Sequence, residues 1–450
     1  MKTIIYWFRN DLRLSDQLGL LAATAQADFF IPVFVLNTAK ESPFPAWHLP
    51  SKPRHSRLKE QYLRESLQAL DKDLKTLGSK LQILEGPPET TLPKLSLSYQ
   101  AEIFCEEIVA PEEEYEVARL RQQGCQVTII WQSSFISPNE LPFEVHHLPD
   151  VFTQFRQQLE KNAVTPPAPL LRITSIPPLP KNIDSANRLS ILDKHLPALS
   201  KVEAENFSNS LYLQKGWQAG EHQAQQHLAS YFRGSLPSTY KETRNQLAGN
   251  TFSTRFSPWL ANGNLSARQI VAQLKCYELH TAKNESTYWI WFELLWRDYF
   301  RFLHLKYKNN LYKNNGLSSL SNAKTEENNQ TEIFLQWING KTPHPLINAA
   351  MNELRLTGWL SNRLRQVVAS YWIYELRGDW RLGAAWFEHC LVDFDIYSNQ
   401  GNWLYIAGLG TDPRGGRRFD IDKQANQYDK DGSYQQWWVN RSHHSVNLTG

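Results

Sequence analysis

Four segments in the second half of the chain combine polar and aromatic side chains in a way that could bind a ligand. The first, residues 251–270, surrounds Arg255 with three hydroxyl side chains just before an expected helix: Ser253, Thr254 and Ser257. Hydroxyls, backbone N–H groups and a helix N-terminus together suit a phosphate or pyrophosphate. An ordinary helix cap has the same composition, so these residues alone leave both interpretations open.

Two further segments carry charged side chains inside expected apolar helices. Residues 286–302 place Glu293 and Arg297 four positions apart, on one helix face beside Trp296, where such a pair is usually structural. Residues 357–371 carry Asn362, Arg363 and Arg365. Arginines on an apolar face need an anion, which is either a carboxylate or a ligand phosphate.

The fourth segment, residues 390–414, contains Asp393 and Asp395, followed by Asn399, Asn402 and Trp403. Two acids this close could bind a metal ion, but no histidine lies near them, and loops that bind hard cations usually supply more oxygens. The same carboxylates could instead accept hydrogen bonds from the hydroxyl and ring N–H groups of a ligand. The spacing does not choose between these alternatives.

Composition limits the possible classes of protein. The chain has 450 residues, 12% of them aromatic and sixteen of them Trp, which excludes a disordered, collagen-like or coiled-coil protein. The formal charge of +3 restricts any nucleic-acid site to a local patch. Four widely spaced cysteines indicate neither a zinc site nor a disulfide framework. Without a signal peptide or a membrane-length apolar run, we expect a cytoplasmic protein that does not bind membranes.

Secondary-structure signals divide the chain into four regions. In residues 1–131, amphipathic helical segments alternate with apolar strands, and the clearest helical segment is 56–77. This alternation predicts an α/β domain with a doubly wound parallel sheet. The expected strands are 4–8, 29–36, 80–84, 102–104 and 126–131. We expect the ligand crevice of such a sheet beyond the carboxyl ends of its strands, although no GxGxxG motif supports a dinucleotide there.

Residues 132–205 predict a long linker, because proline interrupts the pattern in TPPAP (165–169) and IPPLP (176–180). Helical periodicity dominates residues 206–438, which predict an all-α domain, and a short tail follows at 439–450.

Eight motifs together resemble the photolyase and cryptochrome family. In chain order they are WFRNDLRLSD (7–16), YKETRNQL (240–247), STRFSPWLANG (253–263), ELLWRDYFRF (293–302), GWLSNRLRQ (358–366), DWRLGAAWF (379–387), DFDIYSNQGNW (393–403) and GTDPR (410–414). Within the family, the motif YKETRN and the residues Gln366 and Tyr405 are most similar to the DASH-type cryptochromes. These cryptochromes are single-strand DNA photolyases. Photolyases of the cyclobutane-dimer type carry Met and Trp at the last two positions.

The resemblance implies that the N-terminal domain carries an antenna chromophore and that the helical, catalytic domain binds FAD in a bent conformation. It would place Arg297 and Arg365 near the flavin, Asp393 and Asp395 at the adenosine and flavin-ring side, and Asn399 at the flavin N5. The residues implied at the phosphate end are Tyr240, Ser253, Thr254, Phe256 and Ser257. This assignment favours hydrogen bonding to the cofactor over a metal site, and no metal is expected.

The resemblance also implies blue-light-driven repair of cyclobutane pyrimidine dimers by electron transfer from reduced flavin, the reaction of a deoxyribodipyrimidine photo-lyase, a carbon–carbon lyase. Glu293 and Asn362 would hydrogen-bond the flipped bases, and Trp296 would offer them an apolar face. Gln366 and Tyr405 would weaken packing around the dimer, so we expect single-stranded DNA as substrate and doubtful activity on duplex DNA, whose unpairing costs a few kcal/mol. The residues expected to contact strand phosphates are Arg363, Arg417, Arg418 and Lys423.

Two accessory features follow from the same resemblance. Light-driven flavin reduction would use Trp403 and Trp380, but the distal tryptophan position falls on Glu327. The relay would end at Trp380 or exit through Trp337 or Trp372, and we expect slow photoreduction. The second feature is an antenna chromophore, expected to be 5,10-methenyltetrahydrofolate near Glu107.

A second function remains possible on the same scaffold: a blue-light photoreceptor cryptochrome with a signalling or nucleic-acid-binding role and little repair. The short segment after residue 438 favours repair, because signalling relatives usually carry a C-terminal extension. A (6-4) photolyase is less favoured, because its paired histidines are not seen. We expect a monomer.

Overall fold

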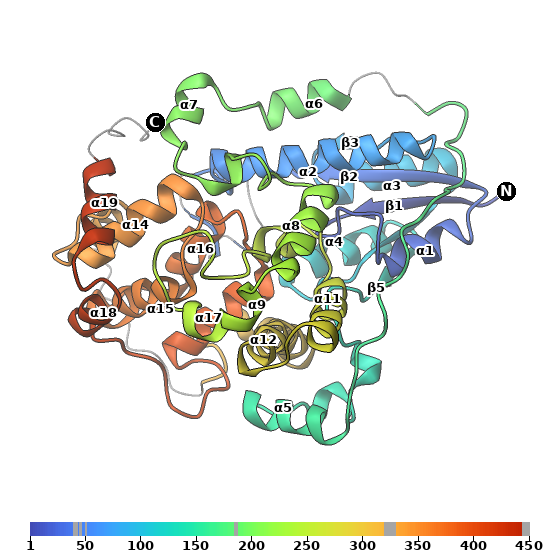
Figure 1. The fold of residues 1–450 in the computed structure, drawn as a ribbon. Helices are drawn as coiled ribbons and strands as arrows, with labels where there is room; N and C mark the ends of the chain where they lie inside the picture. Colours follow the sequence, from blue (N-terminus) through green and yellow to red (C-terminus); the bar gives the residue numbers. More distant parts are fainter. Residues whose placement is uncertain (39–43, 45–46, 50–51, 184–187, 319–329, 443–450) are drawn as a thin grey trace.

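The N-terminal part of the computed structural model is a parallel sheet of five strands in the order β3-β2-β1-β4-β5 (Figure 1). The structure describes residues 1–38, 44, 47–49, 52–183, 188–318 and 330–442. The strands are β1 (Thr3–Phe8), β2 (Phe29–Leu36), β3 (Gln82–Glu85), β4 (Glu102–Glu106) and β5 (Val127–Ile130). The predicted doubly wound parallel sheet is therefore confirmed, with ends that differ by up to two residues from the expected ones.

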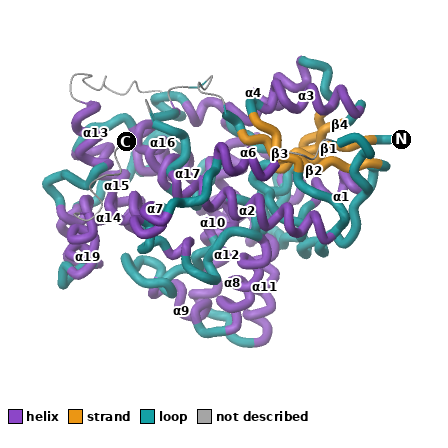
Figure 2. Tube along the Cα trace, turned by 90° about the horizontal axis from the view of Figure 1, so that it is seen from above, coloured by secondary structure: helices purple, strands orange, loops and turns teal. Residues whose placement is uncertain are grey.

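Helices cover both faces of the sheet, as Figure 2 shows from above. Leu20 and Leu67 pack on the face that also receives Ile4 and Phe8, and they come from α1 (Leu18–Thr24) and α2 (Arg57–Thr76). The opposite face is covered by α3 (Pro88–Tyr99) and α4 (Pro111–Gln122). Because both faces are buried, the strands read as apolar runs rather than as alternating patterns.

Residues 132–205 contain more regular structure than the sequence predicted. Three helices form there: α5 (Phe152–Lys161), α6 (Arg188–His195) and α7 (Lys201–Asn206), with short 3₁₀ turns at Pro138–Glu140 and Val145–His147. The sequence did not predict these helices because they are short. In α5 only Phe152, Phe155 and Leu159 are buried, which is too brief a repeat to stand out.

The rest of the chain is helical, and no strand occurs after β5 among the described residues. The central element is α12 (Glu285–Tyr307), which is buried on several sides and packs against α9 and α17. The other helices are α8 (Glu221–Arg233), α9 (Leu236–Thr243), α10 (Ser257–Ala261), α11 (Ala267–His280), α13 (Gln330–Ile338), α14 (Pro345–Thr357), α15 (Asn362–Ser370), α16 (Trp380–Cys390), α17 (Ile396–Ala407), α18 (Ile421–Tyr428) and α19 (Ser433–Ser442). Further 3₁₀ turns lie at Leu211–Leu213 and Lys308–Tyr312, and a π-helical turn at Tyr371–Glu375 follows α15.

The two parts meet where the chain leaves β1. The Arg13 guanidinium donates to the carbonyl of Gly263 (3.0 Å), and Asn264 donates to the carbonyl of Leu12 (2.9 Å). A Cβ on Gly263 would lie 2.0 Å from the carbonyl oxygen of Asn10, so only glycine allows this approach. After β4, the backbone N–H of Val109 donates to the Tyr397 hydroxyl (2.8 Å). The segments that follow the carboxyl ends of β1 and β4, where a ligand crevice was expected, therefore contact the helical part.

Among the described residues, no helix is both long and apolar enough to cross a membrane.

Candidate functional site

A cavity of about 240 Å³ lies between α9, α12, α15, α16 and α17. Its lining residues come from positions between Tyr240 and Ile406, so residues more than 160 positions apart in the chain meet here. Twelve residues that the sequence singled out line it: Tyr240, Ser253, Thr254, Ser257, Glu293, Asn362, Arg365, Gln366, Asp393, Asp395, Asn399 and Trp403. We call it the main cavity.

Asp395 fixes the helix that forms one wall of the main cavity. Its carboxylate caps α17 by accepting from the backbone N–H of Ser398 (2.8 Å), and it forms an ion pair with Arg301, whose side chain is 2% exposed. Burial raises the pKa of Asp395, but the charges of Arg301 and Arg297 outweigh it and hold the pKa below its ordinary value. Both carboxylate oxygens are engaged within the protein, so Asp395 positions α17.

Asp393 differs from Asp395 because one of its oxygens has no partner. Oδ2 accepts from Arg365 Nη2 (2.8 Å), whereas the buried Oδ1 has no hydrogen-bond partner among the described residues. The ring N–H of Trp403 is also buried without a partner among the described residues. Each such atom costs about 1–3 kcal/mol, so this cavity suits a ligand with polar ring edges.

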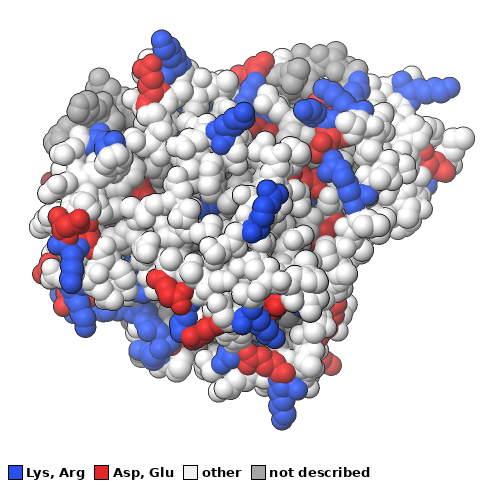
Figure 3. Space-filling model, viewed as in Figure 1, with Lys and Arg blue, Asp and Glu red and all other residues white. Residues whose placement is uncertain are grey.

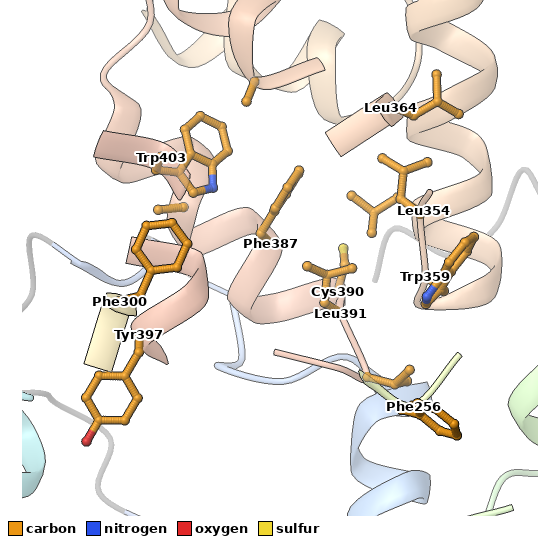
Figure 4. Close-up of a cluster of buried hydrophobic side chains, with 14 of the residues drawn as sticks. Phe256, Phe300, Leu354, Trp359, Leu364, Phe387, Cys390, Leu391, Tyr397 and Trp403 are labelled. Carbon is orange, nitrogen blue, oxygen red and sulfur yellow. The ribbon is translucent and has the colours of Figure 1, made fainter. Parts of the chain in front are cut away.

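Asn399 and Trp403 project into the main cavity from α17. The Asn399 amide nitrogen donates to the carbonyl of Ala384 (3.1 Å), which leaves its Oδ1 as the acceptor for a ligand N–H. Trp403 lies beside Phe387 at 5.2 Å between ring centroids (Figure 4). A Cβ on Gly383 would lie 2.2 Å from the Trp403 ring, so glycine permits this packing.

Glu293 and Asn362 lie on α12 and α15 at the same cavity, with Gln366 one turn beyond Asn362. Burial raises the pKa of Glu293, and its ion pair with Arg244 counteracts the rise. Arg244 also lies over the Trp289 ring at 4.6 Å. Arg244 and Arg255 belong to the motifs YKETRNQL and STRFSPWLANG, but the sequence predicted no role for either side chain.

Four residues expected at the cofactor or the dimer lie outside the main cavity. Trp296 and Tyr405 line a separate cavity of about 250 Å³, where Trp296 stacks on Phe152 at 3.7 Å. Residues two apart on a helix differ by about 200°, so Trp403 and Tyr405 face opposite sides of α17. Arg297 donates to the carbonyl of Ser133 (2.6 Å), and Phe256 is buried in the apolar core.

Both halves of the chain match known protein families. Residues 4–172 match DNA photolyase, and residues 289–446 match the FAD binding domain of DNA photolyase. The chain is 38% identical over 441 residues to a cryptochrome DASH of Idiomarina loihiensis, covering 97% of this chain and 92% of that protein. The chain belongs to the photolyase and cryptochrome family.

Similarity to the cryptochrome DASH branch extends to plants and to solved structures. A chloroplastic/mitochondrial cryptochrome DASH of Arabidopsis thaliana is 38% identical, covering 97% of this chain and 75% of that protein. The crystal structure of a Synechocystis cryptochrome superposes with a TM-score of 0.84 at 36% identity, covering 98% of this chain and 89% of that one. The expected family and fold are therefore confirmed.

The main cavity fits the FAD expected in this family. The hydroxyl side chains of Ser253, Thr254 and Ser257 lie at or just before the start of α10. Arg365 lines the same cavity from α15, and Asp393 lines it from the segment between α16 and α17. The unpaired Asp393 Oδ1 and the Asn399 Oδ1 are acceptors that suit N–H and O–H groups of a flavin nucleotide. No cluster of three or more metal-ligating side chains occurs among the described residues.

The residues expected to relay electrons in this family member are buried. Trp380 is 4% exposed and donates to the carbonyl of Asn314 (2.9 Å). Trp337 and Trp372 stack at 5.0 Å, but both are fully buried, so neither can be the solvent-exposed end of a relay. The distal position, Glu327, lies outside the described residues. Slow photoreduction stays a prediction.

The residues expected to contact DNA phosphates mostly have protein partners. Arg417 pairs with Asp412 (3.3 Å) and Arg418 with Glu375 (2.9 Å), while Arg363 donates to Asn245. The side chain of Lys423 has no ion pair among the residues that the structure describes. Basic and acidic side chains are interspersed over the face drawn in Figure 3. Contacts of these four residues with DNA phosphates stay a prediction.

Changing Asp395 tests its role in positioning α17. We expect Asp395→Asn to lower the free energy of unfolding by about 3 kcal/mol at neutral pH, because it leaves the buried Arg301 unpaired. Folding lowers the pKa of Asp395, so its charge stabilises the folded state less as the pH falls below about 4. The free energies of unfolding of the variant and of the unchanged protein therefore become more similar at low pH. Urea unfolding measures both effects. Asp193→Asn is the control, because the Asp193 side chain is 65% exposed in its pair with Arg64, and it changes stability by less than about 0.5 kcal/mol.

Asp393 tests the cofactor assignment separately. We expect Asp393→Asn to weaken flavin binding at least about tenfold, because the amide removes an acceptor and the charge that pairs with Arg365. The flavin-to-protein ratio after purification and the dissociation constant for added FAD measure this. Unchanged flavin binding would remove Asp393 from the cofactor site.

Proposed function

We propose that this protein uses blue light and FAD to split cyclobutane pyrimidine dimers, with single-stranded DNA as its preferred substrate. One observation carries this proposal: the cavity that suits the flavin also contains Glu293, Asn362 and Gln366. Polar groups that could hold flipped bases therefore face the same space as groups that could hold the electron donor. Electron transfer needs this proximity and no general base.

The roles of individual residues follow from their contacts. Asp393 and Asn399 would accept hydrogen bonds from the cofactor, and the Arg365 guanidinium would favour negative charge on it. When bound and reduced, the flavin supplies the electron that light transfers to the dimer. Arg244 holds the Glu293 carboxylate at the cavity, where it can accept from the ring N–H of a flipped pyrimidine.

The preference for single strands rests on the limited apolar surface around the main cavity. Tyr405 faces away from this cavity, and its hydroxyl accepts from Arg414 (2.8 Å) and Arg417. Trp296 is stacked on Phe152, so one face of its ring is already covered. Without two aromatic faces for the dimer, binding would not offset the few kcal/mol needed to flip it from a duplex.

Repair of a defined substrate tests the proposal. With fully reduced flavin, we expect blue light to remove dimers from an irradiated single-stranded oligonucleotide faster than from the matched duplex. No repair of either substrate would reject the lyase proposal and favour the photoreceptor alternative. Equal rates on both would reject only the strand preference.

A pair of variants on α12 connects repair to the main cavity. We expect Glu293→Gln to lower repair at least about tenfold, because the amide loses the charge and the pairing with Arg244. Glu285→Gln is the matched control, since Glu285 pairs with Lys241 and its side chain is 67% exposed. Equal losses in both variants would mean that the effect does not come from the cavity.

We further propose an antenna chromophore, 5,10-methenyltetrahydrofolate, near Glu107. This carboxyl follows β4, and partial burial beside Glu114 raises its pKa while Lys308 from the helical part lowers it. Those charges place Glu107 close to the boundary between the two parts. An absorption band of the purified protein that free flavin lacks, and that weakens in Glu107→Ala, would support the site. If this absorption band is absent after the protein has been incubated with the folate, the proposed antenna site is rejected.

A further inference from the structure

A third cavity, of about 400 Å³, lies between α14, α19 and the segments 209–212 and 248–250. Figure 1 shows α19 beside α14, near the end of the chain. None of the residues assigned above to FAD, dimer or DNA lines this cavity. It shares Trp359 and Arg255 with the main cavity, so those two side chains separate the two spaces.

The walls of this third cavity are rich in aromatic rings. Trp359 and Trp438 are almost completely buried within it, whereas Trp437 is 51% exposed at its edge. The Arg441 guanidinium lies over the Trp437 ring at 3.3 Å. The Arg255 guanidinium likewise lies over the Trp359 ring at 3.4 Å. Indole rings and guanidinium planes both suit a flat heterocycle, because stacking needs only a planar π-system on the ligand.

Two buried donors in the cavity are unsatisfied. The Tyr212 hydroxyl, on a residue that is 1% exposed, has no hydrogen-bond partner among the described residues, and neither has the Nε–H of Arg255. The two groups lie close together: burial raises the pKa of Tyr212, whereas the charge of the Arg255 guanidinium and its contact with the hydroxyl oxygen lower it, which leaves the hydroxyl hydrogen without an acceptor. Unpaired buried donors are uncommon in folded proteins and indicate a missing acceptor.

The same cavity also contains a buried carboxyl group. Glu353 is 7% exposed, and one of its oxygens accepts from the Tyr434 hydroxyl. Burial raises the pKa of Glu353 to about 7, while Tyr434 and the charges of Arg255 and Arg365 counteract the rise. The cavity therefore offers donors at Tyr212 and Arg255 and an acceptor at Glu353, between aromatic faces.

We propose that this third cavity binds a guanine base. Guanine carries on one edge a ring carbonyl next to ring N–H and amino donors, so the carbonyl can accept from Tyr212 or Arg255 while the N–H groups donate to Glu353. Adenine has no ring carbonyl, and the single lone pair of one of its ring nitrogens could accept from only one of the two donors, whereas the carbonyl oxygen of guanine can accept from both. The base could belong to a free nucleoside or to a DNA strand. The proposal does not depend on repair activity.

Binding of nucleosides to the flavin-loaded protein in the dark tests the inference. We expect guanosine, followed by calorimetry or by quenching of tryptophan fluorescence, to bind at least about tenfold more tightly than adenosine, because a buried polar site rejects a ligand that leaves it unpaired. Absence of guanosine binding, or equal binding of adenosine, would overturn the proposal.

Two variants locate the binding. Tyr212→Phe removes a hydroxyl that has no partner, so we expect no loss of folding stability but at least about fivefold weaker guanosine binding. Trp437→Ala removes the exposed ring and should weaken binding about tenfold. Tyr231→Phe, at a buried tyrosine outside the cavity, is the control and leaves binding unchanged. Normal binding in Tyr212→Phe would overturn the proposal.

Undamaged oligonucleotides identify the source of the base. If a strand base is the ligand, a single-stranded oligothymidylate that carries one guanine binds more tightly than oligothymidylate alone, and Tyr212→Phe removes the difference. If only guanosine depends on Tyr212, the ligand is a free nucleoside. Because neither probe contains a dimer, failure of repair and failure of this site remain distinguishable.

Discussion

The buried ion pair between Arg301 and Asp395 is the contact on which the main cavity depends. Arg301 belongs to α12, which passes through the centre of the helical part, and Asp395 caps α17. The pair therefore fixes α17 against α12 and sets the direction of Asn399 and Trp403. A buried arginine without its carboxylate is costly, so α17 has little freedom to shift.

The orientation of α17 also explains why the chain has more than one cavity. One face of this helix carries Asn399 and Trp403 toward the main cavity, and the opposite face carries Tyr405 toward the cavity lined by Trp296. On the far side of the main cavity, Trp359 and Arg255 form the partition with the third cavity. A ligand in the third cavity would therefore contact residues that also line the flavin site.

The sequence predicted those features that depend on local hydrophobic patterns or on specific motifs. The strands of the sheet were found because buried parallel strands are continuous apolar runs, and β2 has the predicted ends. Asp393, Arg365 and Asn399, which the motifs grouped, line one cavity, and their contacts with the cofactor stay a prediction. Tyr405 lies at the cavity of Trp296 instead, because its offset of two residues from Trp403 places the two side chains on opposite faces of a helix, and its role at the dimer stays a prediction. Arg297 was assigned to the flavin by motif and instead binds a backbone carbonyl near β5.

The sequence alone determined the class of fold, the family and about half of the residues that line the main cavity, because these depend on periodicity and on motifs in a fixed order. Only the tertiary structure decided which carboxylates are already paired. Asp393 and Asp395 look equivalent in the sequence, yet Arg301 and a helix cap occupy both oxygens of Asp395, while Asp393 keeps one free for a ligand. The unpaired Tyr212 hydroxyl was equally hidden, because its surroundings come from α14, α19 and two distant loops.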